Sequence, residues 1–170
     1  MRGENVAPTG VRLRPPGNTL NERAVGWWRA QWLVTAAVPA VVLAVLGTVI
    51  EPARFWLWLP AAVLAVAGLG CAAFFPSWWF RVHRWEVTEN AVYVRTGLFW
   101  QEWRIAPMSR IQTVDTVRGP LEQFFRLSTV TVTTASSKGA IRIAGLDHEL
   151  AADLAEKLTR ITQATPGDAT

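Results

Sequence analysis

The sequence predicts an α+β membrane protein with an N-terminal two-helix transmembrane hairpin, a small antiparallel β domain and a C-terminal helix that caps this domain. Three observations lead to this prediction. Two long apolar runs, 32–50 and 55–75, contain no charged residue. After Pro76 the apolar residues recur with a period of two, which is typical of half-buried strands. Beyond Asp147 they return to the spacing of an amphipathic helix.

The two apolar runs have the length that a membrane span requires. As helices they extend roughly 28–31 Å, close to the ~30 Å hydrocarbon core of a bilayer. Soluble helices of this length normally show a polar face, and these runs show none. Only residues 51–54 connect the runs, so the helices must be antiparallel neighbours. Small residues at helical spacing predict the contacting faces: Ala36, Ala40, Ala44 and Thr48 on the first helix, and Ala61, Ala65, Gly68 and Ala72 on the second.

The residues that flank the hairpin predict its orientation. Arginines concentrate at its two open ends, at Arg12, Arg14, Arg23, Arg29, Arg81 and Arg84, whereas the turn carries one Arg and one Glu. Because basic residues favour the cytoplasmic side, both termini are expected in the cytoplasm. Amphipathic and basic side chains anchor helices at the headgroup level, and the anchors predicted here are Trp27, Trp28, Arg29, Trp78, Trp79 and Arg81.

The hairpin divides the chain into five segments. Residues 1–18 are rich in Pro and Gly and are predicted to be a disordered arm. A short interfacial helix is expected at 19–31, followed by the hairpin at 32–80. The β domain is assigned to 81–163, and 164–170 to a disordered tail.

The β domain shows six or seven short runs of alternating residues. Within 110–117 the apolar residues fall out of phase, which predicts a bulge or a strand that changes face. Asp147 is placed to cap the last helix, whose apolar stripe is Leu150, Leu154, Leu158 and Ile161. Short antiparallel strands followed by one amphipathic helix predict a small bent sheet or barrel with an end or edge covered by the helix.

Charge and site chemistry narrow the classes of function. The net charge of +4 belongs mostly to the membrane flanks, since 81–170 holds eleven basic and ten acidic residues, so nucleic-acid binding is not expected. We find no phosphate-binding glycine loop, paired-histidine metal motif or nucleophile elbow. Asp147, His148 and Glu149 are consecutive and do not face one another in a helix. We therefore expect a protein that is not an enzyme and has neither cofactor nor metal.

Several stretches of the domain carry a family resemblance. The most specific are Ile105–Ala106–Pro107 and the segment from Arg110 to Asp115, supported by Gly119–Pro120–Leu121–Glu122 and Ile143–Ala144–Gly145–Leu146. Residues 11–162 resemble the bacterial pleckstrin-homology-like (PH) proteins of the YdbS-like family. One departure is Arg126, where relatives usually have glycine. The resemblance implies a seven-strand PH-like barrel closed by a C-terminal helix, anchored in the bacterial cytoplasmic membrane, with no known ligand.

Two functional hypotheses follow. The first is a membrane-anchored interaction or scaffolding module that assembles with other membrane proteins, for example a larger sister protein with several PH-like domains or a second copy of itself. The alternative is binding of anionic lipid headgroups by the PH-like domain. For either role the candidate surface is Arg104, Arg110, Gln112, Arg118 and Arg126. The alternative requires these arginines to gather in a concave site without acidic partners.

Overall fold

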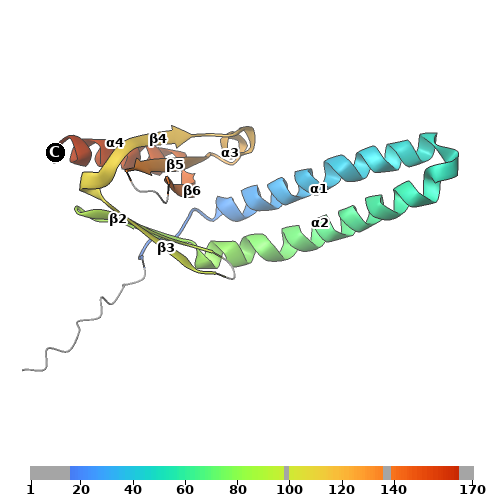
Figure 1. Ribbon diagram of the computed structural model, residues 1–170, viewed down its shortest axis with the longest axis horizontal. Coiled ribbons are helices and arrows are strands. Elements are labelled where there is room, and N and C mark those ends of the chain that lie inside the picture. Colours follow the sequence, from blue (N-terminus) through green and yellow to red (C-terminus); the bar gives the residue numbers. More distant parts are fainter. Residues whose placement is uncertain (1–15, 98–99, 136–138, 165–170) are drawn as a thin grey trace, which may run out of the picture.

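The computed structural model describes residues 16–97, 100–135 and 139–164. Two long helices run side by side, and a β domain lies at their open end (Figure 1). Helix α1 spans Arg23–Val49, the short 3-10 turn η1 spans Glu51–Ala53 and α2 spans Arg54–Val82. Most of the predicted disordered arm and the predicted tail from 165 onward lie outside the described residues.

Both long helices are apolar enough to cross a membrane, and both extend beyond the spans predicted from the sequence. Helix α1 begins at Arg23, so residues 23–31 of the segment predicted as an interfacial helix leading into the bilayer are continuous with the first span. No proline interrupts the chain between these two parts, and the helical hydrogen bonds continue. Helix α2 likewise continues through Pro76 to Val82. Each helix is therefore long enough to span a bilayer and still project from it.

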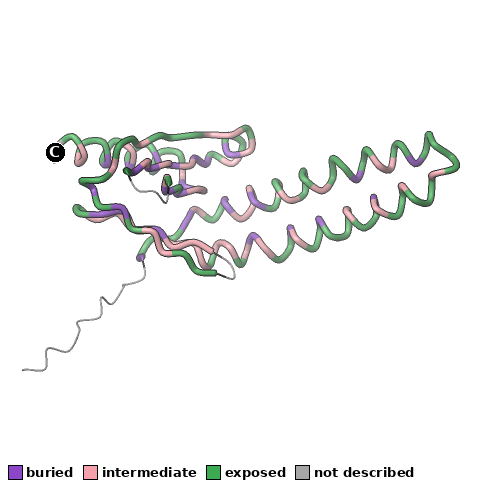
Figure 2. The backbone as a smooth tube through the Cα atoms, viewed as in Figure 1, coloured by how far each residue is buried: buried purple, intermediate pink, exposed green. Residues whose placement is uncertain are grey.

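Small residues form the contact between the two long helices, as predicted, but Thr48 and Ala65 of the predicted faces are exposed, and Gly47 is buried instead of Thr48. Ala40 on α1 and Ala61, Gly68 and Ala72 on α2 are buried. A Cβ atom added to Gly68 would lie 2.2 Å from the Cβ of Ala36, so the two helices are in close contact there. Figure 2 shows that most positions of both helices are exposed, and many of these positions carry large apolar residues, such as Val38, Leu69 and Phe74. This is the distribution expected where lipid is the solvent.

The β domain consists of two three-stranded antiparallel sheets. The first contains β1 (Arg84–Val87), β2 (Ala91–Thr96) and β3 (Glu102–Pro107), in the order β1-β2-β3. The second contains β4 (Ile111–Val117), β5 (Leu127–Thr134) and β6 (Ile141–Asp147), in the order β4-β5-β6. The 3-10 turn η2 (Met108–Arg110) joins the sheets, and the short helix α3 (Pro120–Phe124) joins β4 to β5. The register shifts between Ile111 and Thr113, which confirms the predicted irregularity.

The predicted barrel is not confirmed, because the described strands number six and their two sheets share no hydrogen-bonded ladder. After β3 the chain turns through η2, which carries it from the first sheet to the second. The gap is bridged by a side chain: Arg104 Nη1 donates to the carbonyl oxygen of Ala140 at 3.0 Å. The outer edge of β1 is occupied by Asn18, which forms an isolated bridge with Trp85.

The residues of β3 that face the core are not those that the apolar pattern predicts, but the alternate set. Val94 pairs with Arg104 and Val92 with Ala106, so Arg104 and Ala106 share the inner face. Ile105 pairs with Tyr93 and turns to the outer face. Because β3 is an edge strand, the register of β2 decides which of its residues face the core.

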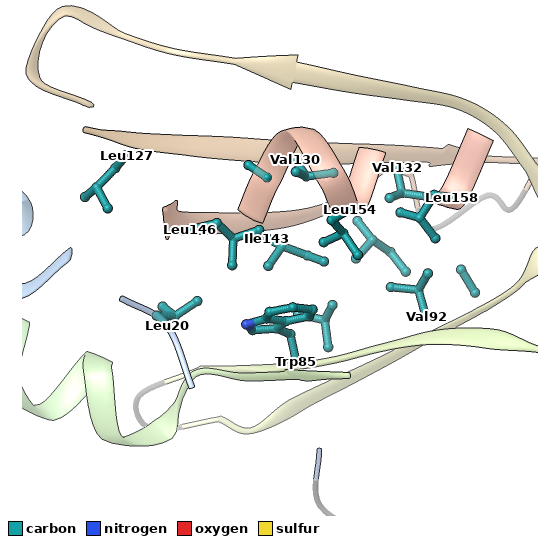
Figure 3. Packing of buried hydrophobic residues seen from close by; sticks show 14 of the residues in the cluster. Leu20, Trp85, Val92, Leu127, Val130, Val132, Ile143, Leu146, Leu154 and Leu158 are labelled. Atoms are coloured by element: carbon teal, nitrogen blue, oxygen red, sulfur yellow. The ribbon is translucent and has the colours of Figure 1, made fainter. Parts of the chain in front are cut away.

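The C-terminal helix α4 (His148–Ala164) packs on the second sheet. Ala151, Leu154 and Leu158 are buried, whereas Leu150 is 45% exposed. The buried stripe is therefore displaced by one residue at its start from the predicted one. Between the sheets, Val92, Val130, Val132 and Ile143 meet the leucines of α4 and Trp85 in one apolar core (Figure 3).

Candidate functional site

Residues 20–28, at and just before the start of helix α1, pack into the core of the β domain, and we call this segment the root of α1. Leu20, Ala24 and Trp28 are buried and belong to the same apolar cluster as the strands. Gly145 on β6 adopts a positive φ of 76°, and a Cβ atom there would lie 2.8 Å from the Cβ of Ala24. The amide of Asn21 donates to the carbonyl of Gly145 at 3.1 Å. The anchor and the domain are thus joined by packing as well as by the chain.

A second contact joins the two helices to the start of the first sheet. The ring centroid of Trp28 lies 5.8 Å from that of Trp79 and 5.7 Å from that of His83. His83 Nδ1 donates to the carbonyl oxygen of Trp79 at 2.9 Å. Burial lowers the pKa of His83 from its usual value of 6.5, and this hydrogen bond offsets only part of the effect. The imidazole is therefore neutral at pH 7.

Beside this junction lies a polar pocket of about 440 Å³, which we call the junction pocket. Its lining comes from five parts of the chain that meet at the root of α1: Arg23 on α1, Arg118 before α3, Arg126 after α3, Asp147 at the end of β6, and His148 and Glu149 on α4.

Local hydrogen bonds hold the pocket's lining in place. Glu122 is buried in α3, where its carboxylate accepts from the amide of Gly119 at 2.7 Å and from Thr129 Oγ1 at 2.6 Å. The Nε of Arg118 donates to the carbonyl of Leu127 at 3.1 Å. Asp147 Oδ1 accepts the amide of Glu149 at 3.1 Å, which confirms the predicted cap of α4. Both walls of the pocket are therefore fixed by the fold.

Arg126 has an unusual backbone conformation within this pocket. Its φ is +56°, in the left-handed region that a residue with a Cβ adopts at a cost of about 1–2 kcal/mol. Arg126 is the only non-glycine with positive φ among the described residues. The Arg126 side chain makes no hydrogen bond or ion pair with any of the described residues. Strain of this kind in a pocket suggests a function for the side chain.

The charges of the pocket are mixed. Three arginines face two carboxylates, and Arg23 Nη1 lies 3.4 Å from Asp147 Oδ2. His148 Nδ1 shares a hydrogen bond of 3.2 Å with Ser128 Oγ. The arrangement leaves a surplus of guanidinium groups, which bind oxyanions bidentately. Its acidic partners weaken that tendency compared with a purely basic site.

The fold brings together only two of the five predicted surface residues, Arg118 and Arg126. Arg104 lies between the sheets and pairs with Glu102 at 2.8 Å. Arg110 is exposed in η2, where its carbonyl accepts the amide of Ala135 at 3.1 Å. Gln112 is exposed at the irregularity of β4. These three residues do not line the pocket.

The predicted membrane anchors also differ in their surroundings. Trp28 is buried in the domain core, and Trp27 and Trp79 are half-buried against it. Arg29 Nη2 donates to Ser77 Oγ at 3.1 Å and so links the two long helices. Trp78 and Arg81 are exposed.

Four pocket residues were not part of the predicted surface: Arg23, Asp147, His148 and Glu149. Arg23 belongs to the positive flank of the membrane span, and nothing in its local sequence links it to β6. His148 follows the cap Asp147, so its position suggested only the first turn of a helix. Among the described residues, no three His, Cys, Asp or Glu side chains are grouped so that they could hold a metal ion.

Comparison with known proteins shows which family the chain matches. The sequence profile described as "Bacterial PH domain" matches residues 30–162. The chain is 28% identical over 156 residues to the UPF0699 transmembrane protein YdbS of Bacillus subtilis (strain 168), and the alignment covers 90% of this chain and 97% of that protein. No solved structure matches the chain significantly. The profile covers most of both long helices and all six strands.

Proposed function

The chain belongs to the bacterial PH domain family, and from this membership we propose that it is a membrane-anchored, non-catalytic interaction module. In this proposal it assembles with other membrane proteins, either a larger sister protein with several PH-like domains or a second copy of itself. It resides in the bacterial cytoplasmic membrane, with both termini in the cytoplasm because the arginines gather at the open end of the hairpin.

One observation carries the proposal. The root of α1 shares the core of the β domain, through Leu20, Ala24 and Trp28. A domain packed on its own anchor holds one orientation at the membrane surface. Such a domain presents the same face to every neighbour in the plane of the bilayer, which lowers the entropy lost on assembly.

The outer face of the first sheet is suited to a protein partner. Helix α4 packs on the second sheet and leaves this face uncovered (Figure 1). Tyr93 and Ile105 form a cross-strand pair on it, with Trp103 on the neighbouring row. Aromatic side chains of this kind are enriched at the centres of protein interfaces.

In-membrane photocrosslinking tests this proposal. A photoreactive amino acid at Ile105 should give one discrete adduct with a membrane protein, and an adduct of twice the chain's mass would identify a second copy. The same amino acid at the exposed Asp153 on α4 is the control and should give none. Tyr93→Glu should abolish the Ile105 adduct. Equal crosslinking from both positions, or adducts with lipid alone, would contradict the proposal.

The membrane orientation is tested separately. Reporter fusions at Pro52 and at Thr170 should report opposite compartments, with Thr170 in the cytoplasm. If both fusions report the same side, one of the two helices does not span.

The junction pocket supports in part a second candidate function, binding of an anionic lipid headgroup, although Asp147 and Glu149 line it and only Arg118 and Arg126 of the predicted arginines lie in it. The observation behind it is Arg126, which lies beside Arg23 and Arg118 with a strained backbone and a side chain that has no partner among the described residues. If Arg126 binds a headgroup, replacing phosphatidylcholine by phosphatidylglycerol in nanodiscs should raise the melting temperature. Arg126→Gly relieves the backbone strain and should remove this lipid dependence without destabilising the chain. A wild-type melting temperature that is the same in both lipids would rule out this second role.

A further inference from the structure

Two aromatic residues of the β domain are the most exposed large apolar residues in the described part of the chain. Trp100 is 87% exposed and Phe124 is 81% exposed. Both values exceed that of Phe74, which at 78% is the most exposed residue of this kind on the lipid-facing helices. Large aromatic side chains left in water forgo the favourable free energy of burial. Such residues usually mark an interaction surface.

Phe124 lies next to the root of α1. It is the last residue of α3, and its ring centroid is 5.3 Å from that of Phe125. Phe125 packs on α1, because a Cβ atom added to Gly26 would lie 3.1 Å from its ring. Phe124 is thus exposed at the end of the domain from which the hairpin emerges.

Trp100 lies at the same end, beside the root of α2. Arg95, near the end of β2, pairs with Arg84, the first residue of β1. Only His83 separates that residue from the end of α2. The chain leaves β2 through Gly97, with a φ of +109°, and the carbonyl of Trp100 folds back against this glycine. Figure 1 shows the end of β2 and the start of β3 beside α2, and α3 beside α1.

Helix length indicates how deep this end lies. About 20 residues cross the hydrocarbon core, and counting back from Val49 places its boundary near Ala30. Gly26 lies about 6 Å farther along the axis. The headgroup layer is about 5–7 Å thick on each side. The contact between Phe125 and Gly26 therefore places α3 at the level of the headgroups.

The charges at this end are complementary to lipid phosphates. Arg84 and Arg95 stand directly opposite each other on the outer face of the first sheet, where like charges repel. Arg84 Nη1 and Arg95 Nε are buried and have no hydrogen-bond partner within the described residues. The Arg95 guanidinium lies 5.5 Å from the ring centroid of Trp103, which orients it. A lipid phosphate beside the two guanidinium groups would offset the repulsion between their charges.

We propose that this end of the domain docks into the headgroup layer of the adjoining leaflet. Trp100 and Phe124 enter the membrane interface on the two sides of the hairpin, and the Arg84–Arg95 pair faces lipid phosphates. The hairpin brings the domain to the bilayer, and the two aromatic contacts set its tilt. The contact requires no particular headgroup and is separate from the junction pocket.

Spin-label depth measurements on the full chain in lipid vesicles test this docking. In a Cys71→Ser background, labels at Gln101→Cys and Gln123→Cys report beside the intact Trp100 and Phe124. The matched control is Ser109→Cys, exposed in η2 at the opposite end, where Met108 bonds to the β1–β2 turn at Asn90. Labels at 101 and 123 should relax severalfold more with oxygen than with a water-soluble nickel complex, and the label at 109 should show the reverse.

Further variants distinguish docking from a mere loss of structure. Trp100→Ser combined with Phe124→Ser should return both labels to the aqueous response while the melting temperature stays unchanged, since neither side chain is packed in the core. Labels at 101 and 123 that are as accessible to nickel as the label at 109 would overturn the proposal. Protection that appears in native membranes but not in vesicles of pure lipid would also overturn it, because a protein would then cover this end.

Discussion

The hairpin and the β domain bury opposite kinds of residue. Between the long helices the buried side chains are small, as at Ala40 and Gly68, and large ones such as Leu69 and Phe74 face outward. In the domain the buried side chains are large, and the exposed ones are mostly polar. Burying large apolar side chains gains no hydrophobic free energy in lipid. The helices are instead stabilised by the packing that close approach of their backbones allows. In water, the hydrophobic effect drives the burial of the large apolar side chains of the domain. At the root of α1 the buried side chains are large, as in the domain, since Leu20 and Trp28 are buried there.

The largest expected effect comes from removing a buried leucine of the domain. Leu154→Ala should lower the free energy of unfolding by about 2–5 kcal/mol, because it leaves a cavity beneath α4. Leu69→Ala, on the lipid-facing side of α2, is the matched control and should cost less than ~1 kcal/mol. Equilibrium unfolding of the full chain in detergent micelles measures both. Equal losses would show that the two regions do not differ in the way described.

The next effect concerns the contact between the anchor and the domain. Gly145→Ala places a Cβ atom 2.8 Å from Ala24 and also forces alanine into a positive φ. We expect a loss of about 2–4 kcal/mol from conformational strain and overpacking together. Gly139→Ala has a similar φ of +78° but open space around it, so it reports the strain alone. If both variants lose the same stability, the close approach of α1 to β6 contributes nothing.

A smaller effect is expected within the hairpin. Gly68→Ala brings two Cβ atoms to 2.2 Å, so the helices must shift apart at a cost of about 1–3 kcal/mol. Gly70→Ala, on the same helix with no atom within 4 Å of the added Cβ, should be neutral. Steric trapping or denaturant unfolding of the hairpin in micelles distinguishes the two. A neutral Gly68→Ala would mean that the small-residue contact is loose.

The smallest effect is the pH dependence from His83. Its pKa is lowered in the folded state by burial, so the unfolded chain binds a proton first as the pH falls. Stability from this group is complete above the unfolded value of 6.5 and declines as the pH drops below it. The melting temperature of the wild type should therefore fall more between pH 7 and pH 5 than that of His83→Phe, which keeps the ring contacts. If the melting temperatures of the wild type and His83→Phe fall equally with pH, His83 is solvated.

The sequence predicted those elements whose signal is local. The apolar runs, the period of two and the Asp147 cap each describe a single segment, and each is present in the structure. The face of β3 could not be predicted, because the pairing of Tyr93 with Ile105 sets it. Trp28 has the pattern of a membrane anchor, yet it is buried in the domain core, where its ring contacts Trp79 and His83.

The junction pocket shows the same limit. Arg118 and Arg126 were recognised as candidates, whereas their proximity to Arg23 depends on Gly145 admitting α1 against β6. The closed barrel was expected from family resemblance, and the turn at η2 separates the described strands into two sheets instead. Contacts between segments far apart in the sequence decided each of these features.

The central claim is that the domain holds one orientation on its membrane anchor. The most direct test is a distance distribution between spin labels at Val34→Cys on α1 and Asp153→Cys on α4, in the Cys71→Ser chain within lipid bilayers. Val34 and Asp153 are both exposed, so the labels do not disturb the core. We predict a single narrow distribution that broadens in Gly145→Ala. A broad distribution in the otherwise unchanged chain would contradict the claim and show a domain that moves freely on its tether.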